Sequence, residues 1–346
     1  MKKRVHVIYD VKGWAYYHRA TALQKHAPED YRVTLGSKLP DEGRIKGLHL
    51  VLVLPPLVNP PARLTKHAPR CVVIGAINDG WGWRADRVAA RRRTYRYLIF
   101  NNWEAYLGYG QPPLAYQISN GVDTDVFRET VPLRQRRPRV LWMASKCHQE
   151  LKGFSLVKSL KGRFRELGLG LDMKLVNSQK PPLTPAEMAD WYNTGTVFVV
   201  ASKADGTPNP ALEAAACGTP VVATAVGNMP ELIADKHNGV LLPGRTPEAV
   251  LKGVQYASKH AQRLSRNMAA TITEWSWRRR AARYFDLFDR LIAGVPPGSE
   301  WNEQTTPEIN SAASARERRR GTDLRPHEPG DGLTGVTAKE MVDSPT

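Results

Sequence analysis

The sequence predicts an α/β protein with two doubly wound domains, each built on a parallel β-sheet with helices on both faces. Short β-branched runs alternate with helical stretches along most of the 346 residues, which is the pattern of repeated strand and helix units. The Pro- and Arg-rich run "PLRQRRPR" near residue 137 divides these units into two sets. A chain of this length can bury two separate hydrophobic cores.

The β-branched runs predict the strands, and their grouping predicts the domains. We expect an N-terminal Rossmann-like domain at 1–135 and a C-terminal Rossmann-like domain at 136–276. The runs in the first domain are "VHVIY", "YRVTL", "HLVLVL", "CVVIG" and "RYLIF", and those in the second are "VLWMAS", "MKLV", "VFVVAS", "PVVAT" and "GVLLP".

Two helices have clear signals. In "TPAEMADWYN", Thr184 is the expected N-cap and Pro185 the first helical residue. In "WSWRRRAARYFDLFDRLI", apolar residues at intervals of three and four predict a long helix at 277–293 that must pack against another element. The residues of this stripe are Trp277, Ala281, Tyr284, Phe288 and Leu291.

The last segment differs in composition from the rest of the chain. Residues 294–346 contain turn-like clusters of Gly, Pro and Asp and few aromatic residues. Such a segment buries too little apolar surface to offset the entropy lost on ordering, so we expect it to be disordered.

The positive charge lies outside this tail. The chain has a formal net charge of +17, and because residues 294–346 have a net charge of −3, the preceding residues carry +20. This charge either aids solubility or attracts an anionic partner, such as a nucleotide, an anionic lipid surface or nucleic acid. The cluster "RVAARRRTYRY" makes a nucleic-acid-binding or nucleic-acid-modifying protein the alternative function, although no known nucleic-acid-binding module is recognisable.

The apolar runs and the cysteines predict a cytoplasmic protein. The first residues lack the apolar stretch of a signal peptide, and prolines interrupt the longest apolar run before it reaches membrane-spanning length. Cys71, Cys147 and Cys217 are scattered and odd in number, which argues against a disulfide framework. Peripheral attachment to a membrane stays open.

Two carboxylates flank a stiff turn in "SKADGTPNPALEAAACGTPVVA". Asp205 follows the strand "VFVVAS", at the carboxyl end of which open α/β folds bind ligands, and Glu213 lies in the first turn of the next helix. Asn209 is expected to cap that helix and Pro210 to be its first residue, which leaves first-turn N–H groups free for a phosphate. Carboxylates accept hydrogen bonds from vicinal hydroxyls, so phosphate and hydroxyls together predict a sugar nucleotide.

Several motifs, in order along the chain, resemble glycosyltransferase family 4, the glycosyl transferases group 1. The segment "ADGTPNPALEAAACGTPVVATAVGNMPELI" is similar to the family's donor-site signature, which is Glu, seven residues and Glu, followed by a Gly-x-Pro-Val strand. The other similar segments are "ISNGVDTDVF", "LKGFSLV", "ADKHNGVLLP" and "WSW". The resemblance implies retaining enzymes of the GT-B fold, in which two Rossmann-like domains face a cleft and the C-terminal helix returns to the N-terminal domain.

The resemblance implies a role for each matched residue. Lys152 would neutralise the diphosphate of the donor, and Glu213 would hold its ribose hydroxyls. Asp205 would contact hydroxyls of the donor sugar, supported by backbone amides near Asn209 and Pro210. For Lys152, an ordinary surface lysine is the alternative.

Other positions depart from the family pattern or extend it. Asp205 stands where the family usually has glutamate, and Lys146 replaces an arginine that the family usually has before Lys152. Where the family often has a histidine, this chain has Asn78 followed by Asp79, which is a candidate acid or base unless Asn-Asp-Gly simply forms a turn. Gly13, after the first strand, permits a close backbone approach to a diphosphate.

The resemblance implies a hexosyltransferase-type reaction of class EC 2.4. A sugar would pass from a nucleotide-diphosphate sugar to an acceptor hydroxyl with retention at the anomeric carbon. We expect no metal and no further cofactor, because no Asp-x-Asp element lies near a strand end that would bind the donor and Lys152 can stabilise the leaving group. A glycoside hydrolase would need both acids at one reacting centre, which the helical position of Glu213 opposes. The acceptor, whether saccharide, lipid or modified nucleic acid, is not specified.

Overall fold

The first domain contains a six-stranded parallel sheet. The structure, a computed structural model, describes residues 1–55, 70–78, 85–176 and 183–303. The strand order is β2-β1-β3-β4-β5-β6, and every pairing is parallel. Five of these strands were predicted; the sixth, β6, is a three-residue "AYQ" strand without a β-branched residue. The strands are β1 (Lys3–Ile8), β2 (Tyr31–Gly36), β3 (Leu50–Val53), β4 (Val72–Ile77), β5 (Tyr97–Phe100) and β6 (Ala115–Gln117).

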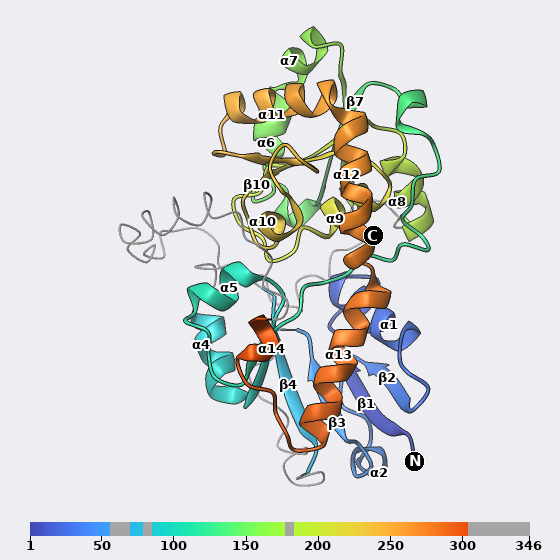
Figure 1. The fold of residues 1–346 in the computed structure, drawn as a ribbon, viewed down its shortest axis with the longest axis vertical. Coiled ribbons are helices and arrows are strands. Elements are labelled where there is room, and N and C mark those ends of the chain that lie inside the picture. The colour runs from blue at the N-terminus through green and yellow to red at the C-terminus, as the bar shows by residue number, and fades with distance from the viewer. Residues whose placement is uncertain (56–69, 79–84, 177–182, 304–346) are drawn as a thin grey trace, which may run out of the picture. The chain divides into compact units, whose positions relative to one another are not determined.

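The second domain contains a five-stranded parallel sheet with the order β11-β10-β9-β7-β8, and all five strands were predicted. The α/β fold class with two parallel sheets is therefore confirmed (Figure 1). The strands are β7 (Arg139–Ser145), β8 (Gly170–Val176), β9 (Val197–Val200), β10 (Val221–Thr224) and β11 (Val240–Leu242).

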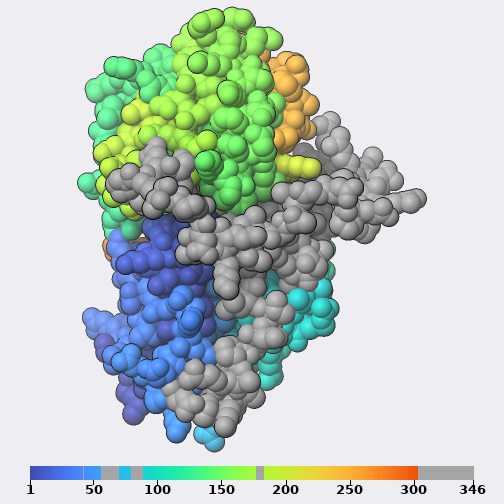
Figure 2. Space-filling view, turned by 180° about the vertical axis from the view of Figure 1, so that it is seen from behind, coloured from blue at the N-terminus to red at the C-terminus, as the bar shows by residue number. Residues whose placement is uncertain are grey.

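Helices connect the strands of both sheets. In the space-filling view of Figure 2, the green segment that includes α6, α7 and β8 reaches the surface. None of the described helices is both long and apolar enough to span a bilayer. The helices of the first domain are α1 (Ala15–Lys25), α2 (Glu42–Ile45), α4 (Ala85–Thr94) and α5 (Trp103–Gly108), followed by the 3₁₀ turn η1 (Leu133–Gln135). Those after it are η2 (Lys146–His148), α6 (Phe154–Ser159), α7 (Lys161–Glu166), α8 (Pro185–Tyr192), α9 (Asn209–Ala216), α10 (Met229–Leu232), α11 (Pro247–Lys259), α12 (Ala261–Glu274), α13 (Trp277–Ile292) and α14 (Glu300–Glu303).

Both predicted helix signals are confirmed. Helix α8 begins at Pro185 with Thr184 as N-cap, and Glu187 completes a reciprocal capping box. Helix α13 buries all five residues of its apolar stripe in the hydrophobic core that also contains Val5 and Leu50 of the first sheet. The helix therefore covers a face of the first sheet and contacts α1 (Figure 1).

The expected disorder of the tail is wrong for residues 294–303. Trp301 is 4% exposed and Asn302 is 3% exposed. The Trp301 indole N–H donates to Asp286 at 2.8 Å, and the Asn302 side chain accepts from the Gln117 backbone N–H at 2.8 Å. Trp301 and Asn302 thus anchor this stretch to α13 and to strand β6. Residues 304–346 lie outside the described residues.

Candidate functional site

The structure pairs two of the predicted site residues after β7 and β9. The Lys152 ammonium donates to Asp205 Oδ2, and their side chains are 24% and 12% exposed, respectively. Lys152 follows β7 and Asp205 follows β9, and these strands are neighbours in the parallel sheet. A partly desolvated cation and anion therefore meet at the carboxyl edge of the sheet, where open α/β folds bind ligands.

Gly153 fixes the position of Lys152. Its φ is +85°, and a Cβ atom there would lie 2.4 Å from the Ala201 carbonyl oxygen. The Lys152 carbonyl accepts from the Trp142 indole N–H at 3.1 Å, and the Lys203 N–H donates to the Leu151 carbonyl at 2.8 Å. The loop after β7 is thus held directly against the segment after β9.

We expect Gly153→Ala to lower the free energy of unfolding by about 2–5 kcal/mol, because the new methyl group adds a clash with Ala201 to the strain of a positive φ. Urea denaturation measures this change. Gly168→Ala is the matched control, because Gly168 also has a positive φ, of +73°, but has no atom within 4 Å of its Cβ position. Equal losses in the two variants would show that the contact with Ala201 is unimportant.

The start of α9 differs from the prediction by one position. Pro208 is the N-cap, Asn209 is the first helical residue and Pro210 the second, so the prediction that Asn209 caps the helix is wrong. The Asn209 N–H donates to the Thr207 carbonyl, and the Ala211 N–H donates to the Pro208 carbonyl, both at 2.8 Å. Because prolines at 208 and 210 lack N–H groups, the expected free amides in this first turn are not found.

The turn between Asp205 and α9 is buttressed by a loop after β10. The Asn228 N–H donates to the Gly206 carbonyl at 3.2 Å, and its side-chain amide donates to Thr207 Oγ1 at 3.1 Å. Gly227 is needed for this approach, because its φ is +54° and a Cβ atom would lie 2.2 Å from the Gly206 oxygen. Asn228 is a site residue that was not predicted, although its place after the Gly-x-Pro-Val strand was a usable signal.

Two amide oxygens near this turn are free to accept hydrogen bonds. Oδ1 of Asn228 and Oδ1 of Asn120 are buried and have no hydrogen-bond partner among the described residues. The Asn120 side-chain amide lies 3.5 Å from Asn209 Oδ1, which places it beside the start of α9. A hydroxyl-rich ligand can supply the donors that these oxygens lack.

Glu213 is held by Tyr192, which was not predicted as a site residue. The Tyr192 hydroxyl, at the end of α8, donates to Glu213 Oε2 at 2.7 Å. Burial raises the pKa of Glu213 to about 7, and the hydrogen bond from Tyr192 opposes this rise. Burial also raises the pKa of Tyr192 well above its usual value, so the phenol stays a donor. Glu213 thus has a fixed orientation and loses its proton near neutral pH.

A second carboxylate, Glu231 on α10, has a similar environment. It accepts from the Trp103 backbone N–H at 2.6 Å and from the Ser119 hydroxyl at 2.8 Å. Burial raises the pKa of Glu231 to about 7, against the effect of these two donors. Glu231 links the loop after β10 to residues that follow β5 and β6.

The other predicted site residues do not join the Lys152–Asp205 pair through any contact between described residues. Lys146 is exposed at the start of η2, directly after β7, and forms no ion pair with a described residue. Gly13 has a φ of +84°, and its carbonyl accepts from His18 Nε2 at 3.0 Å. Asn78 donates to the Leu54 carbonyl and accepts from Arg19, so its side chain is engaged in structure. Asp79 lies outside the described residues.

The comparisons with known proteins match the segment that contains this site. Residues 125–260 match the family model described as Glycosyl transferases group 1. A D-inositol 3-phosphate glycosyltransferase of Streptomyces bingchenggensis is 33% identical over 135 residues, which are 38% of this chain and 30% of that protein. One from Thermobispora bispora is 28% identical over 252 residues, which are 69% of this chain and 54% of that protein. The chain thus spans only part of the length of these relatives.

Solved structures show the same fold. Sucrose-phosphate synthase from Thermosynechococcus elongatus superposes with a TM-score of 0.64 at 16% identity, over 85% of this chain and 100% of that one. The Anabaena protein HepE in complex with UDP superposes with a TM-score of 0.59 at 14% identity, over 84% of this chain and 100% of that one. The predicted GT-B fold is confirmed by these neighbours.

Proposed function

We propose that this chain, which has the GT-B fold and carries a domain of the glycosyl transferases group 1 at residues 125–260, transfers a sugar from a nucleotide-diphosphate sugar to an acceptor hydroxyl with retention of configuration. The observation that carries the proposal is the Lys152–Asp205 pair at the carboxyl edge of the second sheet, followed in the chain by α9 with Glu213. HepE, a neighbour in fold, has been solved with UDP and with UDP-glucose, which supports a donor of this class.

Lys152 and Asp205 have complementary tasks in this proposal. The donor diphosphate competes with Asp205 for the Lys152 ammonium, because a diphosphate carries more negative charge than one carboxylate. Lys152 then stabilises the charge that develops on the leaving nucleoside diphosphate. Asp205, released from the ion pair, accepts hydrogen bonds from hydroxyls of the donor sugar. Each member of the ion pair thus exchanges its partner for a group of the donor.

Glu213 and the two asparagines complete the donor site. Glu213, oriented by Tyr192, accepts hydrogen bonds from the ribose hydroxyls through its remaining carboxylate oxygen. The free Oδ1 atoms of Asn120 and Asn228 accept from sugar hydroxyls beside the 205–209 turn. Lys146 adds positive charge after β7. This arrangement stabilises the leaving group through the protein's own cations and requires no metal in our proposal.

The nucleic-acid alternative rests on charge alone. The relatives and structures named above are, by their names, enzymes of sugar chemistry or a protein bound to UDP. The α4 arginines that prompted the alternative include Arg91, which is buried and donates to the carbonyls of Ala76 and Pro55. One cation of that cluster therefore has a structural role, and a sugar transferase is the better supported function.

A melting-temperature screen tests the proposed function. One of UDP-, GDP-, ADP- or dTDP-sugars, at about 100 times its Kd, should add about 3 kcal/mol to the free energy of unfolding, which raises Tm by a few degrees. Glu213→Ala should remove this shift, because the ribose loses its acceptor. Glu166→Ala, which truncates an exposed glutamate on α7, should keep it. Absence of a shift with all four donors would count against the transferase.

A further inference from the structure

A basic pocket lies at the opposite edge of the second sheet from the donor site. It has a volume of about 520 Å³. Pro138 and Thr196, which line it, directly precede β7 and β9, whereas Lys152 and Asp205 follow the same two strands. Seven residues of β7 at roughly 3.3 Å each separate these edges by about 20 Å. A ligand in this pocket is therefore outside the donor site.

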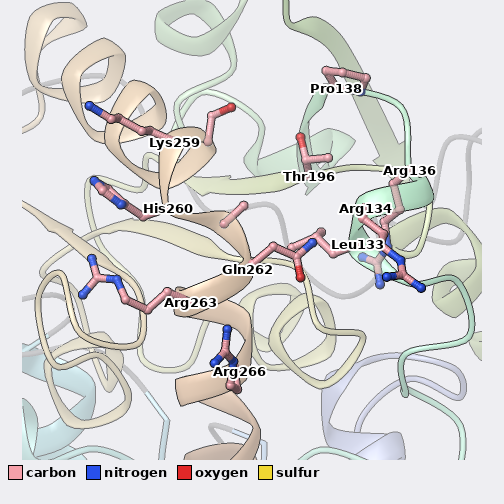
Figure 3. A pocket seen from close by; sticks show the side chains of 12 residues that line it. Leu133, Arg134, Arg136, Pro138, Thr196, Lys259, His260, Gln262, Arg263 and Arg266 are labelled. Carbon is pink, nitrogen blue, oxygen red and sulfur yellow. The ribbon is translucent and has the colours of Figure 1, made fainter.

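Cations from separate parts of the chain surround the pocket. Arg134 comes from η1, Lys259 from the end of α11, and Arg263 and Arg266 from α12. Figure 3 shows the α12 arginines on one side and Arg134 on the other, with Gln262 between them. All four of these cations are exposed. None forms an ion pair with a described residue, and no Asp or Glu lines the pocket.

Arg136 differs from these four cations, because its charge is already used. It donates to Asn193 Oδ1 at 3.0 Å, and to Thr219 Oγ1 and the Cys217 carbonyl, both at 2.7 Å. The Glu129 carboxylate lies 3.5 Å from the Arg136 guanidinium, and the Arg136 side chain is fully buried. Arg136 therefore belongs to the wall of the pocket, and the unneutralised charge comes from the other four residues.

The start of α12 also lies at the pocket. His260 is its N-cap, no side chain caps the helix, and its first turn contains no acidic residue. Ala261, Gln262 and Arg263 of this turn all line the pocket. The negative end of α11, which also ends at His260, opposes the positive end of α12, so the positive potential of the pocket comes from the exposed cations.

We propose that this pocket binds a ligand that carries two or more phosphate groups, a role that goes beyond the proposed transfer reaction. Guanidinium groups bind phosphate oxygens in a bidentate manner, and three of the four exposed cations are arginines. Because the cations stand on two sides of the pocket, a single phosphate reaches fewer of them than a longer polyanion does. No Phe, Tyr or Trp ring lines the pocket, and His260 supplies its one imidazole, so recognition depends mainly on the phosphates.

Isothermal titration of the full-length protein with inorganic tripolyphosphate, pyrophosphate and phosphate tests this proposal. Affinity should decrease in that order and should weaken as salt increases. Arg263→Gln/Arg266→Gln should weaken tripolyphosphate binding at least tenfold. Lys161→Gln/Arg165→Gln on α7 is the matched control, because it removes the same charge from exposed residues far along the chain from the pocket. That control should bind within twofold of the unmodified protein.

Two further measurements separate this site from the donor site and identify the source of the phosphates. Lys152→Gln should keep the tripolyphosphate binding that Arg263→Gln/Arg266→Gln loses, and Arg263→Gln/Arg266→Gln should retain the melting-temperature shift with the nucleotide sugar. Flotation with cardiolipin and phosphatidylcholine vesicles then distinguishes a lipid headgroup from a soluble ligand, and either result supports the proposal. The proposal is overturned if Arg263→Gln/Arg266→Gln binds tripolyphosphate as tightly as the unmodified protein does and loses no cardiolipin binding.

Discussion

Lys152→Gln is expected to reduce the turnover number for sugar transfer by a factor of about 10²–10³, the size of effect seen when one group that stabilises developing charge is removed. Among the described residues, Lys152 is the only lysine or arginine that forms an ion pair with Asp205. Glutamine keeps much of the side-chain volume but cannot neutralise a leaving diphosphate. Steady-state kinetics with the donor found in the melting screen measure kcat and KM separately.

A double variant separates this catalytic role from a structural one. Lys152→Gln alone leaves the partly buried Asp205 carboxylate without its partner, which should lower the free energy of unfolding by about 1–3 kcal/mol. In Lys152→Gln/Asp205→Asn the charge is gone, so stability should recover while turnover stays low. Recovery of turnover together with stability would mean that the pair only supports the fold. Lys146→Gln, at an exposed cation, should lower turnover less.

The fold was predictable because its signals are local and repeated. The ten β-branched runs reflect the burial of the strands, and the apolar stripe on α13 reflects the burial of one helix face. Both patterns can be read from residue types alone. Strand β6 was missed because its three residues form a strand by pairing with β5, and they have no β-branched pattern of their own. The anchoring of residues 294–303 was missed because it depends on Trp301 and Asn302 meeting α13 and β6, which are distant in sequence.

The site was predictable in its residues but not in its contacts. The signature spacing identified Lys152, Asp205 and Glu213, yet no spacing rule pairs Lys152 with Asp205, 53 positions apart. Tyr192 lies on a different helix from Glu213, and only the tertiary fold brings its hydroxyl to the carboxylate. The start of α9 was misplaced by one residue because Asn209 and Pro208 both suit a helix terminus. In the structure the Asn209 N–H donates to the Thr207 carbonyl, and Pro208 is the N-cap.

Replacing Glu213 by Gln is expected to stabilise the protein above neutral pH and to stabilise it much less at pH 5. Glu213 has a pKa of about 7 in the folded protein and about 4.5 when unperturbed, because burial disfavours its ionised form. Between these values the folded state binds more protons than the unfolded state, so this carboxyl favours folding less and less as pH rises from 4.5 to 7. The loss amounts to up to about 3 kcal/mol. Glu231, with a pKa of about 7 from the same cause, should behave alike in Glu231→Gln.

The comparison at each pH isolates these two carboxyls from other titrating groups. Burial lowers the pKa of His6 and of His26, so these histidines favour folding more as pH rises and oppose the carboxyls in the unmodified protein. Urea denaturation of each variant and the parent at pH 5, 6, 7 and 8 cancels that contribution. A stability difference that stays constant from pH 5 to 8 would contradict the burial of Glu213 or Glu231. In our proposal the ribose hydroxyls bind the ionised form of Glu213. Donor affinity should therefore rise over the same pH range in which this carboxylate lowers the stability of the fold. A buried glutamate at this position thus serves binding and not folding.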